Sequence, residues 1–130
     1  MMITSAETRD LIGDILNTCQ DAVIWIDTNS HIVQWNNKAE ALFGFRRESV
    51  LKHSITSTII PDEHRVGHLK GMAKYMDTGH GNVFGVKTTI NAVTWSGEEI
   101  MVTLAIDKIS VSGTQYFTAQ IAPFVEQNER

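Results

Sequence analysis

Two histidines four residues apart carry the clearest chemical possibility in this sequence. His64 and His68 would share one face of a helix, a spacing that could bind zinc. The glutamate of the H-E-x-x-H motif and an obvious third ligand are both missing, so zinc is a weak interpretation and we expect His64 to be exposed. His68 also shares a helix face with Met72 and Tyr75, where a neutral imidazole could enter an apolar pocket and ligate iron.

Catalytic motifs are missing from the rest of the sequence. It contains no G-x-S-x-G, Walker, paired-cysteine or kinase signature. Cys19 is the single cysteine, which we interpret as a small core or interface residue. His31, His53 and His80 fall in turns, where solvated histidines need no function. The sequence therefore predicts a binding module and not an enzyme.

The composition is that of an ordinary globular chain of one domain. Of the 130 residues, 42% are hydrophobic and 20% are charged, which argues against disorder. A net charge of -4 without a basic stripe argues against nucleic-acid binding and against contact with an anionic membrane surface. The lone cysteine and the lack of a leader segment favour a reducing, cytoplasmic location, although the sequence could be one piece of a longer membrane receptor.

An N-terminal helix is the first element that the sequence predicts. Thr4 and Glu7 have the spacing of a capping box, in which each residue satisfies a backbone N–H of the first turn. An apolar stripe follows at helical spacing. It consists of Leu11, Ile12, Ile15, Leu16 and Cys19.

Two short strands and a short helix should follow. The strands are expected at 22–27 and 31–35, with turn residues between them. Asn36 or Asn37 then caps a helix that Gly44 can end in a left-handed conformation.

A longer helix is predicted over 61–78, after short helical turns at 46–60. Pro61 is expected at its first position, and Gly79 is the expected stop. Its apolar stripe consists of Leu69, Met72, Ala73 and Met76.

Three strands complete the prediction, at 83–94, 99–110 and 114–121. In the second of them, alternation places one set of apolar residues on a single face: Ile100, Val102, Leu104 and Ile106. The order of helix, two strands, several helices and three strands predicts an α+β fold. We expect a five-stranded antiparallel sheet with helices packed on one face.

The segments D-A-V-I-W-I-D and H-I-V-Q-W-N-N-K-A-E-A-L-F-G resemble the opening of a PAS domain. The family pattern of strand, turn, strand, Asn, Ala-Glu and Phe-Gly is met at Asn36, Ala39, Glu40, Phe43 and Gly44. The resemblance covers residues 11–122. It implies a PAS fold and a dimerising sensor module of the kind found in histidine kinases and chemoreceptors. The central pocket of such a module holds haem, flavin, a small metabolite or nothing.

Within the family, residues 61–106 resemble the haem-binding oxygen-sensor PAS domains of FixL type. Their P-x-x-x-R-x-x-H run, followed by a tyrosine, matches at Pro61, Arg65, His68 and Tyr75. The resemblance implies haem b with His68 as its axial iron ligand, and gas or redox sensing as the function. The apolar residues of the gas-binding side fall on Val83, Leu104 and Ile106. The complete set of expected cofactor-binding residues is His68, Met72, Tyr75, Val83, Leu104, Ile106 and Phe117.

Two positions depart from the FixL-type pattern. Thr88 stands where those sensors carry the arginine that stabilises bound oxygen. Asn82 stands where they carry a histidine near the haem propionates. Oxygen binding by that mechanism is therefore not expected, even if haem binds.

Two alternatives to haem remain open. A redox-sensing flavin PAS domain needs no cysteine and could bind FAD with the tryptophans and asparagines available, which are Trp25, Trp35, Asn36 and Asn37. Alternatively, large side chains could close the pocket, which would leave a cofactor-free interaction module or a small-metabolite sensor. The side chains that could do so are Met72, Phe84, Met101 and Phe117.

The expected organisation has three parts: an N-terminal amphipathic helix at 1–20, the PAS core at 21–123, and at 124–130 the start of a linker to a covalently attached output domain. The helix must bury its apolar stripe, which predicts a homodimer formed through this helix and the sheet. Many PAS domains end in an Asp-x-Thr motif. Residues 122–125 read Ala-Pro-Phe-Val instead, so the output contact should differ.

Overall fold

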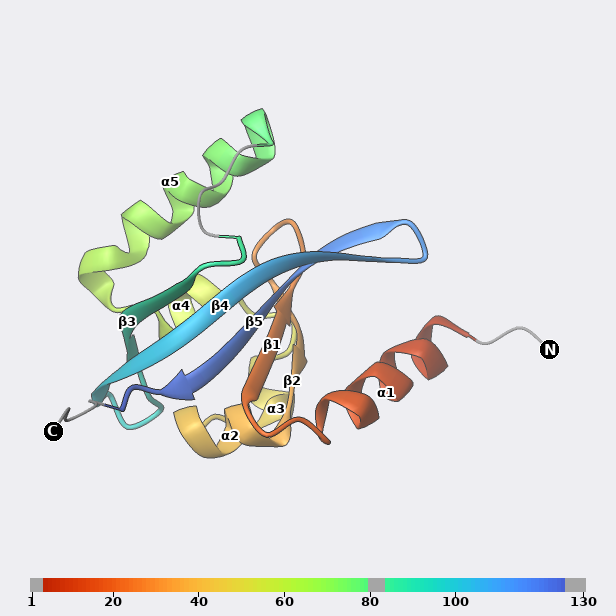
Figure 1. Ribbon diagram of the computed structural model, residues 1–130, viewed down its shortest axis with the longest axis horizontal. Helices are drawn as coiled ribbons and strands as arrows, with labels where there is room; N and C mark the ends of the chain where they lie inside the picture. The colour runs from red at the N-terminus through yellow and green to blue at the C-terminus, as the bar shows by residue number, and fades with distance from the viewer. Residues whose placement is uncertain (1–3, 80–83, 126–130) are drawn as a thin grey trace, which may run out of the picture.

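One antiparallel sheet of five strands, in the order β2-β1-β5-β4-β3, organises the chain (Figure 1). The computed structural model describes residues 4–79 and 84–125. The first and last strands pair at the centre of the sheet, where Ala22 lies opposite Ile121. The predicted α+β class and the antiparallel five-stranded sheet are confirmed. The strands are β1 (Ala22–Ile26), β2 (Ile32–Trp35), β3 (Lys87–Val93), β4 (Glu99–Val111) and β5 (Thr114–Pro123).

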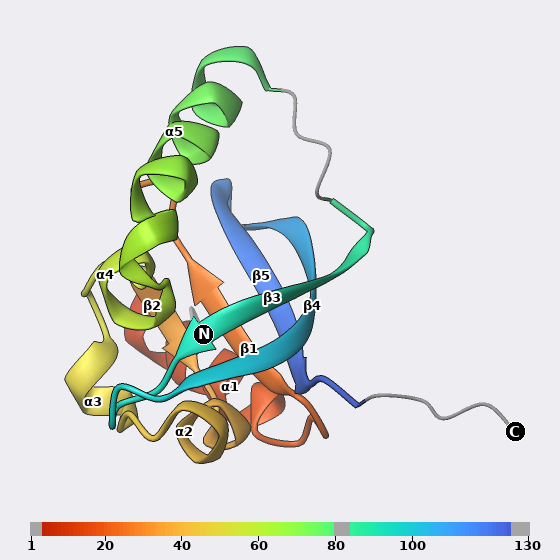
Figure 2. The ribbon, with the colours of Figure 1, turned by 90° about the vertical axis from the view of Figure 1, so that its left-hand side faces the viewer.

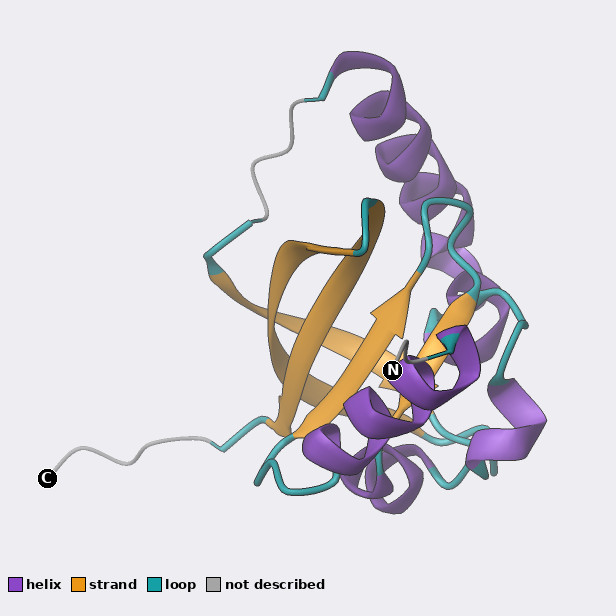
Figure 3. Ribbon diagram, turned by 90° about the vertical axis from the view of Figure 1, so that its right-hand side faces the viewer, coloured by secondary structure: helices purple, strands orange, loops and turns teal. Residues whose placement is uncertain are grey.

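Helices cover the two faces of the sheet unequally. Four of the five described helices lie on one side, and α1 lies across the other (Figures 2 and 3). They are α1 (Ser5–Leu16), α2 (Asn37–Phe43), α3 (Arg47–Val50), α4 (Ile55–Ile59) and α5 (Asp62–Thr78). Among the described residues, no helix has the length and apolar character needed to cross a membrane.

The helix ends follow the capping chemistry that the sequence predicts. Thr4 and Glu7 form a complete capping box at the start of α1. The side chain of Asn36 caps α2, and Gly44 ends that helix with a φ of 79°. Gly79 ends α5 in the same left-handed conformation. Pro61 is the N-cap of α5 and not its first helical residue, which corrects the predicted start by one position.

The main core fills the space between the sheet and the helices that follow β2. Trp35, Phe43 and Ile32 are its largest fully buried side chains. The rings of Trp35 and Phe43 lie 5.6 Å apart, and the indole N–H of Trp35 donates to the carbonyl of Phe45. This side of the sheet therefore gives β1, β2 and α2 a rigid base.

A smaller core lies between α1 and the opposite face of the sheet. Leu16, Val23 and Trp25 are its buried members, and Ile12 and Cys19 pack against them. The remaining two residues of the predicted α1 stripe are exposed, Leu11 at 51% and Ile15 at 56%. The stripe is therefore divided between the sheet and the solvent.

The face that α5 turns toward the sheet differs from the predicted one. Leu69 and Met76, members of the predicted apolar stripe, are exposed at 52% and 47%. The half-buried residues are Arg65, His68, Met72 and Tyr75, at the same helical spacing but rotated around the axis. Of the predicted stripe only Met72 is half-buried, and Ala73 is exposed. The reason is that contacts with other elements decide the orientation of α5 over apolar periodicity. Arg65 makes polar contacts with α4, and Tyr75 packs on Phe117 of β5.

The strand that follows α5 begins later than predicted. β3 starts at Lys87, and Phe84 forms only an isolated bridge with Ile106. Gly85, between them, has a φ of 75° and donates its backbone N–H to the carbonyl of Ile106. The first predicted residue of this strand, Val83, lies outside the described residues.

Candidate functional site

The imidazole of His68 lies at the corner between α4 and α5. Its Nδ1 is 2.7 Å from the hydroxyl oxygen of Thr56, a buried residue of α4. Burial lowers the pKa of His68 below its ordinary value of 6.5. Since the charged form is disfavoured, the ring is mostly neutral near pH 7. With Nδ1 engaged by Thr56, Nε2 is the nitrogen left to meet a ligand.

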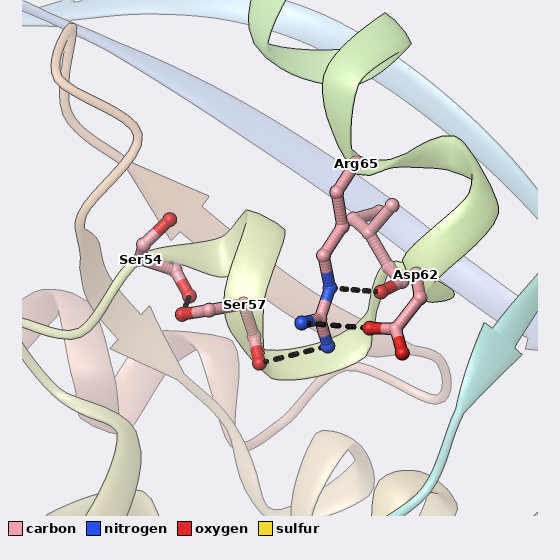
Figure 4. A network of polar contacts seen from close by, with 5 residues as sticks. Ser54, Ser57, Asp62 and Arg65 are labelled. Carbon is pink, nitrogen blue, oxygen red and sulfur yellow. Dashed lines mark hydrogen bonds and ion pairs between the residues drawn. The ribbon is translucent and has the colours of Figure 1, made fainter.

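Arg65 fixes the corner that brings Thr56 and His68 together. Its guanidinium donates to the carbonyls of Ile60 at 2.9 Å and Ser57 at 3.4 Å, and it pairs with Asp62 at 2.9 Å (Figure 4). These contacts hold the last turn of α4 against the first turn of α5. A guanidinium can do this because its donors form a planar fork with several fixed directions.

A groove of about 670 Å³ opens between the first half of α5 and the edge strand β3. We call it the β3–α5 groove. Its volume falls in the range of small-molecule sites, and His68 is one of its walls. The other lining residues are Ile60, Pro61, Glu63, His64, Gly67, Thr89, Ile90, Asn91 and Met101.

Gly67 contributes to the width of this groove. It lies inside α5, and a Cβ placed on it would meet no atom within 4 Å. A larger side chain at this position would therefore extend into open space without displacing the protein around it. Gly71, one turn later, is equally open but does not line the groove.

Two of the predicted site residues meet in an aromatic cluster. The ring of Tyr75 lies 5.4 Å from that of Phe117 and 5.1 Å from that of Phe84. The Nζ atom of Lys108 lies over Phe84 and Tyr75, at 5.6 Å and 6.0 Å from the ring centroids. These side chains fill the space between the second half of α5 and the sheet.

The remaining predicted site residues are dispersed. Leu104 packs against the main core, and Ile106 forms its bridge with Phe84, so neither lines the β3–α5 groove. Met72 is half-buried on the inner side of α5, and Val83 lies outside the described residues. Of the six predicted residues that the structure describes, only His68 lines the groove.

The side chains considered for flavin are engaged within the protein. Trp35 is bonded to Phe45, and Asn36 makes all of its hydrogen bonds to the backbone of neighbouring elements. Trp25 belongs to the core beneath α1, and the side chain of Asn37 is exposed.

Sequence reasoning missed several residues around His68. Thr56 lies twelve positions earlier in a short helix, and no spacing rule connects it with a histidine of the next helix. Thr89 and Asn91 come from the edge strand and reach the groove only through the tertiary fold. His64 lines the groove as well, but residues 4–79 and 84–125 contain no group of three or more His, Cys, Asp or Glu side chains able to hold a metal ion.

Curated relatives of this chain include sensor proteins. An uncharacterized protein of Azorhizobium caulinodans is 31% identical over 123 residues, which cover 91% of this chain and 17% of the relative. Sensor protein FixL of Bradyrhizobium diazoefficiens is 24% identical over 91% of this chain and 23% of its own length. Oxygen sensor protein DosP of Escherichia coli is 26% identical over 75% of this chain and 12% of its own length. The chain thus spans less than a quarter of each of these relatives.

The fold has counterparts among solved structures. The PAS domain of an HTR-like protein from Haloarcula marismortui superimposes with a TM-score of 0.64 at 16% identity, over 92% of this chain and 93% of that one. The family described as PAS fold matches residues 13–109, from α1 through most of β4. The chain therefore belongs to the PAS family.

Proposed function

We propose that this PAS domain is the sensory module of a signal-transduction protein, and that it binds a small ligand in the β3–α5 groove. One observation carries the proposal: a half-buried, neutral histidine, oriented by Thr56, lines a groove of small-molecule size. The names of FixL and DosP as sensor proteins support a sensory role. Binding without catalysis is part of the proposal.

Haem b is the ligand that we favour. The residues present fit its iron side, because the lowered pKa keeps the ring of His68 neutral near neutral pH, and Nε2 is a ligand in the tautomer whose Nδ1–H donates to the hydroxyl of Thr56. His68 would hold the iron, and Thr56 would orient the imidazole. When bound, haem supplies an iron centre that responds to gases or to redox state. Ile60, Ile90 and Met101 would give the group an apolar surface.

The aromatic cluster favours a second candidate, a PAS module without a cofactor or with a smaller metabolite. Tyr75, Phe84 and Phe117 already fill the region where the FixL-type pattern has its gas-binding side. Such a module would act through its surfaces or through a compact ligand beside His68. A flavin is the third choice, since the tryptophan and asparagine side chains that could serve it are engaged elsewhere or exposed.

A haem titration separates these candidates. We expect the purified chain to develop a saturable Soret band that is lost or strongly shifted in His68→Ala. His53→Ala is the matched control, because His53 is exposed and does not line the groove. Gly67→Leu should also weaken haem uptake, by filling the groove, while Gly71→Leu should not. A band that is absent, or that survives His68→Ala unchanged, would reject haem ligation by His68.

We further propose that ligand binding shifts the population of two states of the sheet. β3 borders the groove and pairs with β4, which pairs with β5, so a change at the groove has a continuous path to the centre of the sheet. A ligand moves this equilibrium only through its different affinities for the two states. Hydrogen exchange in β3, β4 and β5 should therefore change on saturation, and identical exchange with and without ligand would exclude the mechanism.

A further inference from the structure

A second groove lies on the other face of the sheet, beneath the first half of α1. Its volume is about 410 Å³, within the size range of small-molecule sites. Ser5, Thr8, Arg9 and Ile12 line it from α1, at the i, i+3, i+4 and i+7 positions of one helix face. We call it the α1–hairpin groove, because the β4–β5 hairpin forms its opposite wall with Val111, Ser112, Thr114 and Tyr116.

The groove exists because α1 is fixed to the sheet from Arg9 onward, and its first turn is not. The side-chain amide of Gln34 donates to the carbonyl of Arg9, and its oxygen would lie only 3.3 Å from a Cβ placed on Gly13. The carbonyl of Leu16 accepts from Asn36 at 2.8 Å. Figure 1 shows α1 running outward from this attachment, alongside the hairpin. Space for a small ligand therefore remains between α1 and the β4–β5 hairpin.

The walls of the groove combine aromatic surface with a single positive charge. Trp25 and Tyr116 line it with rings whose centroids are 5.9 Å apart. Arg9 is the one charged residue among the lining side chains, and no carboxylate in residues 4–79 and 84–125 forms an ion pair with it. Arg9 is exposed, and the planar fork of a guanidinium matches the geometry of a carboxylate.

We propose that the α1–hairpin groove is a second binding site, which takes a small aromatic carboxylate. The ring of the ligand would lie against Trp25 and Tyr116, and its carboxylate would pair with Arg9. The hydroxyls of Thr8 and Ser112 supply further donors from opposite walls. Because such a ligand touches both α1 and the hairpin, it stabilises the docked position of α1. This proposal does not depend on a ligand binding at His68.

Two probes that share one ring system and differ in charge test the proposal. The ¹⁵N-labelled 130-residue chain is titrated with indole-3-acetate, an aromatic anion, and with tryptamine, its cationic counterpart. We expect saturable amide shifts at Thr8, Arg9 and Ser112 with the anion only, and a shift of the Trp25 indole N–H signal. Amide exchange in α1 should slow at saturation.

Two arginine variants make the test specific. Arg9→Gln should weaken indole-3-acetate binding roughly fivefold, the magnitude of a partly exposed ion pair. Arg46→Gln is the control, because Arg46 is an exposed arginine that pairs with Glu48 outside the groove. Both variants should give the native spectrum without ligand. The proposal is wrong if the anion produces no saturable shifts at this groove, if tryptamine binds equally well, or if Arg9→Gln binds the anion as tightly as the unmodified chain. Shifts confined to residues around His68 would equally overturn it, while leaving the first site in place.

Discussion

Asn36 shows at the scale of one residue how the sequence holds separate elements together. Its side-chain oxygen accepts from the backbone N–H groups of Val23 and Ala39, at 2.9 and 3.0 Å. Its amide nitrogen donates to the carbonyls of Leu16 and Asp21, at 2.8 and 3.1 Å. One buried amide thus connects the end of α1, the start of β1 and the start of α2. The four bonds satisfy both N–H donors and both lone pairs of the buried amide.

Replacing Asn36 by alanine should destabilise the chain by about 2–4 kcal/mol, since four backbone groups lose a partner and three of the lost bonds are buried. Urea denaturation followed by circular dichroism measures the change. Asn37→Ala is the matched control: its side chain is exposed, and only its backbone N–H bonds to Asn17. A loss below about 0.5 kcal/mol for Asn36→Ala would contradict the connecting role.

The lowered pKa of His68 makes a second prediction at this scale. Burial disfavours the charged imidazole in the folded state, so the unfolded chain binds the proton more readily. The free energy of unfolding should therefore be fully maintained above the ordinary pKa of 6.5. It should fall as the pH drops below that value toward the lower pKa of the folded state.

Comparison with His68→Gln isolates this contribution from the other titrating groups. We expect the unmodified chain to lose more stability than the variant between about pH 7.5 and about pH 5. Denaturant titrations at both pH values provide the measurement. Equal losses in the two proteins would mean that protonation of His68 is not coupled to folding.

At the scale of elements, α5 marks the limit of what the sequence could predict. Its start near Pro61 and its stop at Gly79 follow from local chemistry. So do the other predicted helix caps and the order of helices and strands along the chain. Its orientation does not. Apolar periodicity selects the face with Leu69 and Met76, but the ion pair and hydrogen bonds of Arg65 turn a neighbouring face inward.

The residues of the candidate site likewise fall into those that the sequence predicted and those that it did not. His68 was predicted from a family pattern and a helix face, and it does line the groove. Thr56 and Asn91 were not, because Thr56 meets His68, and Asn91 meets the groove, only after separate segments have folded together. Leu104 and Ile106 share a strand face as the alternation predicts, but the alternation says nothing about the aromatic side chains that cover that face.

Two glycines of α5 should respond oppositely to the same substitution. Gly67 has helical backbone and open space around its missing Cβ, so Gly67→Ala should raise stability by about 0.5–1 kcal/mol. Gly79 has a φ of 72°, which disfavours any Cβ, so Gly79→Ala should lower stability by about 1 kcal/mol. Thermal denaturation of both variants tests the pair. A gain for Gly79→Ala, or a loss for Gly67→Ala, would contradict the assigned backbone roles.

At the scale of the whole molecule, the sheet separates two layers. The β3–α5 groove lies at the edge on one side, and α1 with its own small core lies on the other. β1 connects them, because it pairs with β5 at the centre and its side chains enter both cores. The ligand-dependent change that we propose for the sheet would therefore reach α1 through packed contacts.

The exposed half of the α1 stripe suggests where a second copy of the chain would bind, which is the homodimer that we propose. Leu11 and Ile15 are four residues apart and more than half exposed, a costly arrangement for a helix that stays unpaired. Light scattering after size exclusion should show a dimer at high protein concentration.

Ile15→Asp should raise the dissociation constant of this dimer by roughly tenfold or more, because a charge would be buried in the contact. Leu69→Asp, which places the same charge on the equally exposed outer face of α5, should leave the dimer intact. A monomer at every concentration would reject the dimer, whereas dissociation by Leu69→Asp alone would move the contact to α5 and leave α1 free to respond to a ligand in its own groove.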